Sequence, residues 1–212
     1  MLPFKSQQFL AVFRSYNEAI WPAQIVAYLL AGLAVAALYG RSARSDRIIA
    51  AALAIMWAWT GIAYHLAFFA TINKAAYVFS VQFIIQAASL AYAGFLQHRI
   101  AFGFHPAPTA WLGAFFVLYA TILYPLIGMV AGHSYPELPM FGVTPCPVTI
   151  FTFGMLLLTL RPSPVSLLAI PALWSLIGGS AAILLSVPQD WLLLVSGMVG
   201  VGFIIARARK AA

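Results

Sequence analysis

Long apolar segments with no charged side chain in their middle constrain this sequence more than any other feature. About 20 mostly apolar residues are enough to cross a bilayer as a helix. Seven segments approach or meet this requirement, of which the fifth is the shortest: roughly 20–39, 48–71, 76–97, 109–131, 146–160, 164–186 and 190–206. Charged residues make up only 7% of the chain, against about 25% in soluble domains. The sequence therefore predicts an all-α, polytopic membrane protein: one integral membrane domain over residues 1–212, with a seven-helix bundle at 20–206.

The first 19 residues are too polar to cross a bilayer. Phenylalanines alternate with Lys5, Arg14 and glutamines in this stretch, which favours a short amphipathic helix lying in the membrane interface. Ser6 is a suitable N-cap for it. We therefore expect residues 1–19 to form an interfacial helix.

Basic residues concentrate on one side of the seven predicted spans. The turns and the C-terminal segment on that side carry Arg41, Arg44, Arg47, Arg99, Arg161, Arg207, Arg209 and Lys210. The segments on the opposite side carry only Lys5, Arg14 and Lys74. Since Lys and Arg collect in cytoplasmic loops, the sequence predicts an N-out, C-in chain. Residues 207–212 would be a basic cytoplasmic tail and residues 132–145 an extracytoplasmic loop. In a bacterium this is a multi-pass protein of the inner (cytoplasmic) membrane, and its net charge of +7 needs no nucleic-acid partner.

The stretch from Gly132 to Gly154 differs from the rest of the chain. It contains a loop of about sixteen residues with four prolines, a histidine, a glutamate and the single cysteine of the chain, and it has no Lys or Arg. Loops of this length are usually functional or disordered, and the proline and aromatic content favours order. We expect the Gly132–Thr144 loop to be a lid over a periplasm-facing site.

Polar and aromatic side chains from several spans should lie at the level of this loop. A polar group that faces lipid without a partner costs several kcal/mol, so these side chains should face one another around a cavity. The predicted ligand-binding residues are Tyr64, Trp57, Gln82, Gln86, Tyr124 and Asp190. Trp57 and Trp59 are two positions apart, so only one of them can point inward.

His65, His133, Cys146 and Glu18 form a candidate metal site within this set. Imidazole, thiolate and carboxylate ligands suit zinc or copper, although their spacing matches no known metal motif. The competing structural interpretations are a buried, hydrogen-bonded histidine at 65, a loop cap at 133 and a small apolar filler at 146. A nucleophilic alternative has Cys146 as thiolate, His133 as base, and Glu18 or Glu137 as the group that orients the base.

Two functional classes are disfavoured. No Asp, Glu, Lys or Arg lies in the middle of a predicted span, which argues against a proton-driven pump. The seventh span has no lysine for a retinal Schiff base.

Several motifs together are similar to those of a known group of sequences: NEAIWPAQ at 17–24, WTGIAYHLAFF at 59–69, YPLIGMVAGHSYP at 124–136, FGVTPCPVTIFTFG at 141–154, IPALWSLIGGSAA at 170–182 and PQD at 188–190. They resemble a family of uncharacterised bacterial seven-helix membrane proteins classed as a domain of unknown function. The resemblance covers nearly the whole chain. It implies an architecture, and no activity, cofactor or substrate.

The sequence predicts an outward-facing cavity that binds or passes a metal ion or small solute. The first alternative is a membrane-embedded hydrolase, metal-dependent or cysteine-based, acting on a lipid-like substrate. The second is an accessory membrane subunit without its own activity. The expected partners are the lipid bilayer and a small molecule or metal ion, and a homo-oligomer is compatible with each case. Passage requires a continuous polar route to the inner face. A hydrolase requires a closed cavity with a lateral opening to lipid. An accessory subunit would have no pocket and an exposed apolar patch on its outer loops.

Overall fold

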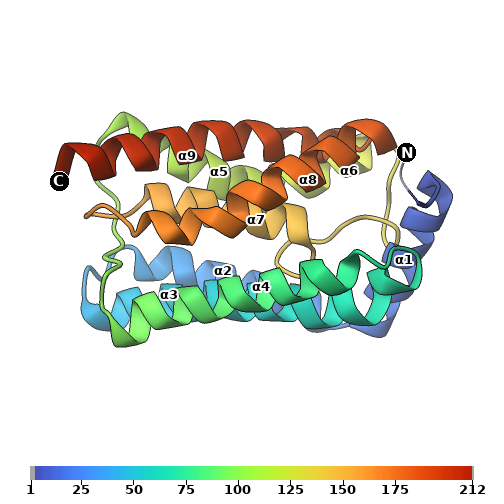
Figure 1. Ribbon diagram of the computed structural model, residues 1–212, viewed down its shortest axis with the longest axis horizontal. Coiled ribbons are helices and arrows are strands. Elements are labelled where there is room, and N and C mark those ends of the chain that lie inside the picture. Colours follow the sequence, from blue (N-terminus) through green and yellow to red (C-terminus); the bar gives the residue numbers. More distant parts are fainter. Residues whose placement is uncertain (1–2, 212) are drawn as a thin grey trace.

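The computed structural model describes residues 3–211, which form an elongated bundle of helices without a β-strand (Figure 1). Most helices run along the long axis of the bundle. Three segments are π-helical (η1, η3 and η4) and three are short 3₁₀ turns (η2, η5 and η6). In chain order the elements are α1 Ser6–Ala19, α2 Ala23–Ala37, α3 Ala43–Trp59, η1 Thr60–Phe68, η2 Phe69–Thr71, α4 Ala76–Ala91, η3 Tyr92–Leu96, α5 Pro108–Leu118, η4 Tyr119–Leu123, α6 Tyr124–Val130, α7 Pro145–Leu157, η5 Val165–Leu168, α8 Ala169–Leu185, η6 Pro188–Asp190 and α9 Trp191–Ala211.

Five helical stretches are long and apolar enough to cross a membrane: Ala43–Thr71, Ala76–Leu96, Pro108–Val130, Val165–Leu185 and Pro188–Lys210. A sixth arises if α1 and α2, which are bent by 83° at their junction, count as one broken span. The remaining predicted span coincides with α7, which is apolar but has only 13 residues. The predicted all-α, membrane-compatible fold is confirmed, and every predicted span overlaps an observed helix.

The N-terminal helix α1 lies across one end of the bundle (Figure 1). It buries Phe13 and Tyr16 on one face and exposes Arg14 and Glu18 on the other, as expected for an amphipathic helix. The N-cap is Lys5, so Ser6 is already the first helical residue. Residues 1–2 of the predicted interfacial segment and residue 212 of the predicted tail lie outside the described residues. The basic residues of that tail, Arg207 to Lys210, continue α9 as a helix.

Two ends of the bundle can be distinguished by their composition. The loop end holds α1, the turn at 72–75 and the Gly132–Thr144 loop, whereas the opposite, basic end holds the turns at 38–42, 97–107 and 158–164 and the end of α9 (Figure 1). At the basic end the turns bond to the neighbouring ends of α3 and α9. The backbone N–H of Phe102 donates to Asp46 Oδ1 at 2.7 Å, and Arg207 Nη2 donates to the carbonyl of Thr159 at 2.8 Å.

Helix α7 forms the centre of the bundle. Every residue from Pro145 to Leu157 is buried except Cys146, which is half-buried. The backbones of α7 and α5 pack closely together at two glycines. A Cβ added to Gly113 of α5 would lie 2.7 Å from the carbonyl oxygen of Gly154, and one added to Gly154 would lie 2.8 Å from the carbonyl oxygen of Gly113. Paired small residues of this kind let helices approach closely in membranes.

Candidate functional site

The Gly132–Thr144 loop folds into the bundle and does not cover it as a lid. Leu138, Phe141 and Val143 are at most 3% exposed, so the second half of the loop fills space between helices. α7 therefore begins inside the bundle. The expectation of an external lid is therefore wrong for the second half of the loop. Burial of its apolar side chains between the helices is more favourable than their exposure to water.

Helix α1 supplies the hydrogen bonds that this inserted loop needs. Asn17 Nδ2 donates to the carbonyls of Pro136 at 2.7 Å and Leu138 at 2.8 Å, and the Tyr16 hydroxyl donates to that of Val143. Buried carbonyls without a donor would be costly. The loop and α1 are thus held as one unit at the end of the bundle.

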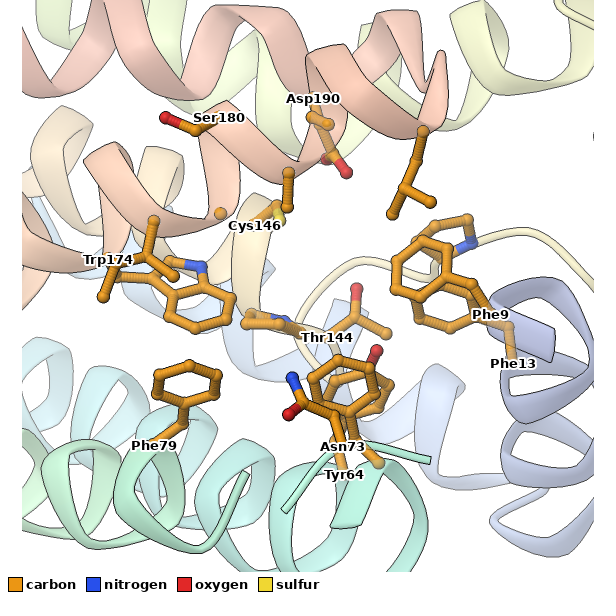
Figure 2. Close-up of a pocket in the computed structure, with 18 of the residues that line it drawn as sticks. Phe9, Phe13, Tyr64, Asn73, Phe79, Thr144, Cys146, Trp174, Ser180 and Asp190 are labelled. Atoms are coloured by element: carbon orange, nitrogen blue, oxygen red, sulfur yellow. The ribbon is translucent and has the colours of Figure 1, made fainter. Parts of the chain in front are cut away.

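A cavity of about 230 Å³ lies next to this unit (Figure 2). Its walls come from α1, η1, η2, α4, the start of α6, the Gly132–Thr144 loop, the start of α7, α8 from Trp174 onward and η6. Most of the wall is aromatic, made by Phe4, Phe9, Phe13, Tyr64, Phe69, Phe79, Tyr124 and Trp174. The cavity is therefore suited to an apolar or aromatic body.

A few polar groups interrupt this aromatic wall. Asp190 points its carboxyl into the cavity, and Cys146 lies between Asp190 and Trp174 (Figure 2). The Tyr124 hydroxyl donates a hydrogen bond to Asp190. Asn73, Thr144 and Ser180 complete the polar part of the lining.

Asp190 has no cationic partner within residues 3–211. The one ion pair in that range is Arg14–Glu137, at 2.6 Å, and no Lys, Arg or His is among the cavity-lining residues. Asp190 is 3% exposed, and buried charges are normally paired. An acceptor group without a counter-ion therefore faces an apolar space.

The π-helical segment η1 shapes one wall of the cavity. It carries Tyr64, whose ring stacks on Phe13 and Phe69 at centroid distances of 5.4 and 5.5 Å. Gly61, in the same segment, allows η1 to lie against α4, where an added Cβ would be 3.1 Å from the Ser80 carbonyl. π-Helical segments occur frequently at functional sites.

Four of the predicted site residues line this one cavity: Tyr64, Tyr124, Cys146 and Asp190. The other predicted ligand-binding residues are not among its lining residues. Trp57 Nε1 instead donates to Thr152 Oγ1 at 2.9 Å in the core, Gln86 Nε2 donates to the Leu167 carbonyl at 3.0 Å, and Gln82 is half-buried on α4.

The sequence interpretation missed the largest ring in the wall, Trp174, and the aromatic face of α1. Trp174 carried no signal that separates it from a packing residue. Phe9 and Phe13 were assigned to the membrane interface as part of an amphipathic helix, yet they line the cavity. An apolar helix face does not reveal whether it covers lipid or protein.

The structure does not bring the four proposed metal ligands together. His65 is fully buried among Tyr64, Phe83 and Trp174, and neither of its ring nitrogens has a hydrogen-bond partner in the part of the chain that the structure describes. Glu18 is exposed on α1 and His133 is half-buried in the loop. Within residues 3–211 no group of three or more His, Cys, Asp or Glu side chains is placed to hold a metal ion.

His133, the base of the nucleophilic alternative, is not among the residues that line the cavity with Cys146.

A family model described as a family of unknown function, DUF6064, matches residues 6–212. Neither the curated proteins nor the solved structures include a match to this chain.

Proposed function

We propose that this chain, which belongs to that DUF6064 family of unknown function, is a membrane protein that binds a small organic molecule in the aromatic cavity at its loop end. The observation that carries the proposal is the enclosure of Asp190, Tyr124 and Cys146 by aromatic rings from five separate elements. A mostly apolar pocket with a few convergent polar groups is the usual form of a small-molecule site.

We further propose seven passes, with the N-terminus outside and the C-terminus inside. The basic residues at the end opposite the cavity support this orientation, because Lys and Arg favour the cytoplasmic side. α7 is about 20 Å long at 1.5 Å per residue, and the inserted loop completes its pass. In a bacterial inner membrane the cavity would then face the periplasm.

Entry from the side is supported by two exposed residues of α8. Ser180 and Leu184 are both exposed and both belong to the cavity wall. They are four positions apart and share one face of the helix. A mouth on this face, near the outer interface, would admit a molecule that partitions into the membrane surface.

The apolar core below the cavity supports binding of the molecule rather than its passage through the protein. The buried part of α7 below the cavity is largely apolar and includes Ile150, Phe151 and Phe153, each 0% exposed. Passage would need a polar route at this level. The accessory-subunit alternative predicts no pocket, so the cavity counts against it. A lateral mouth would suit a hydrolase, but His133, the base expected for Cys146, is not among the residues of the cavity wall.

The test is native mass spectrometry of the protein released from membranes in a mild detergent. Ala181 lines the cavity and Ala172 lies on the same helix outside it. The wild type and Ala172→Phe should carry a bound small molecule that Ala181→Phe lacks. An identical set of bound masses in all three proteins would contradict binding in this cavity.

A further inference from the structure

We propose that the ligand is a small organic cation, an alkylammonium ion whose charge lies against Asp190 and the surrounding aromatic rings. This inference rests on the proposed function, because it names the chemical class of the molecule that the cavity binds.

The first argument is the uncompensated carboxyl group. Asp190 lies almost fully buried in η6, immediately before α9, and accepts a hydrogen bond from Tyr124. The N-terminus of a helix supplies only about half a positive charge, and no basic side chain lines the cavity. A cationic ligand would provide the missing charge, whereas an anion would be repelled.

The second argument is the aromatic wall. The faces of aromatic rings are electrostatically negative and attract ammonium groups, and aromatic cages that bind quaternary ammonium ions work in this way. Tyr64 and Phe13 lie stacked, and Trp174 and Phe79 lie edge to face at 5.3 Å. The Asp190 carboxyl and these aromatic rings line the same cavity, so both can contact one ammonium group.

The third argument is size. The cavity volume of about 230 Å³ lies just below the range of about 300–1,000 Å³ that is usual for ligand pockets. A molecule of the size of choline fits this space, and a phospholipid does not fit inside it as a whole.

Cys146 provides the readout, because it is the single cysteine of the sequence and lines the cavity. The rate at which N-ethylmaleimide alkylates it in the detergent-purified protein would be measured with choline or with 3,3-dimethylbutan-1-ol. The two probes have the same shape, and a neutral carbon in the alcohol replaces the charged nitrogen. The variants are Asp190→Asn, which keeps the shape of the side chain, and Glu18→Gln, which removes an exposed acid at the same end of the bundle.

Choline should slow the alkylation of the wild type and of Glu18→Gln, and the alcohol should not. Asp190→Asn should need at least about tenfold more choline for the same protection. Equal protection by the two probes, or protection by neither, would contradict the proposal that the ligand is a cation. In both cases the cavity itself is judged separately, since Ala181→Phe should slow alkylation without any ligand. If Ala181→Phe has no effect either, the proposed binding cavity fails as well. The comparison of the two probes in the wild type needs no variant to fold.

Discussion

The hydroxyl of Tyr16 donates a 2.6 Å hydrogen bond to the backbone carbonyl of Val143 and accepts a 2.9 Å hydrogen bond from Trp59 Nε1. One buried oxygen thereby joins α1, the end of the inserted loop and the helix that leads into η1. Because α1 forms part of the cavity wall, this contact fixes the position of that wall relative to the rest of the bundle.

Replacing Tyr16 with Phe should destabilise the protein by about 1–3 kcal/mol, because the Val143 carbonyl and the Trp59 indole would both lose a buried partner. Tyr39→Phe is the matched control, since Tyr39 is 80% exposed at the basic end. Unfolding of both variants in detergent would be followed by circular dichroism. Equal stabilities would show that the bond contributes nothing measurable.

Replacing Asn17 with Asp should loosen the inserted loop. The amide nitrogen that donates to the Pro136 and Leu138 carbonyls would become a third acceptor oxygen facing two others. We expect faster alkylation of Cys146, because the loop leads directly into the helix that carries it. Glu18→Gln, a change on the exposed face of the same helix, should leave the rate unchanged. An alkylation rate for Asn17→Asp equal to that of the wild type would contradict the role of Asn17 in holding the loop.

Replacing Thr152 with Val should leave the Trp57 indole N–H unpaired inside the bundle. Both residues are 0% exposed, so the expected cost is about 1–3 kcal/mol. Thr152→Ser keeps the hydroxyl and should recover much of that stability. If the serine variant is no more stable than the valine variant, the hydrogen bond is not the cause.

Replacing Gly113 or Gly154 with Ala should be strongly destabilising, because the added methyl group would press on the backbone of the facing helix. Gly32 offers a matched control within α2, since an added Cβ there meets nothing within 4 Å. Gly32→Ala should be neutral or stabilising by up to about 1 kcal/mol. Thermal unfolding of the three variants would decide the point, and equal effects would refute close packing of α5 on α7.

The proposed orientation can be tested with single cysteines in a Cys146→Ser background. Ser134 is exposed at the loop end and Tyr39 at the basic end. A membrane-impermeant maleimide added to intact cells should label Ser134→Cys and spare Tyr39→Cys until the cells are opened. The reverse labelling pattern would show that the orientation is opposite to the one proposed.

The apolar segments made most of the fold predictable. Span length and hydrophobicity depend on local composition alone, so each predicted segment overlaps a helix, and the separate helix at 6–19 was also anticipated. A smaller part of the candidate site was predictable for a similar reason: Tyr64, Tyr124, Cys146 and Asp190 were expected at one level of the membrane, and they line one cavity.

The remainder of the site depends on contacts between distant segments. The sequence placed the Gly132–Thr144 loop outside as a lid, because it follows an outward-running predicted span and carries no Lys or Arg. Its insertion depends on the donors Tyr16 and Asn17, more than 110 positions away. His65 shows the converse. A histidine near other potential ligands suggested a metal, yet its surroundings are aromatic rings supplied by α4 and α8.

The central position of α7 also has a consequence for how the protein is made. A 13-residue apolar helix reaches only about two thirds of the roughly 30 Å hydrocarbon core, so it has little tendency to leave the translocation machinery for lipid on its own. Its neighbours α5, α8 and α9 must already be available to receive it. Ribosomes stalled just after Leu157 should therefore hold this segment uninserted, and its integration should follow the synthesis of the last two helices.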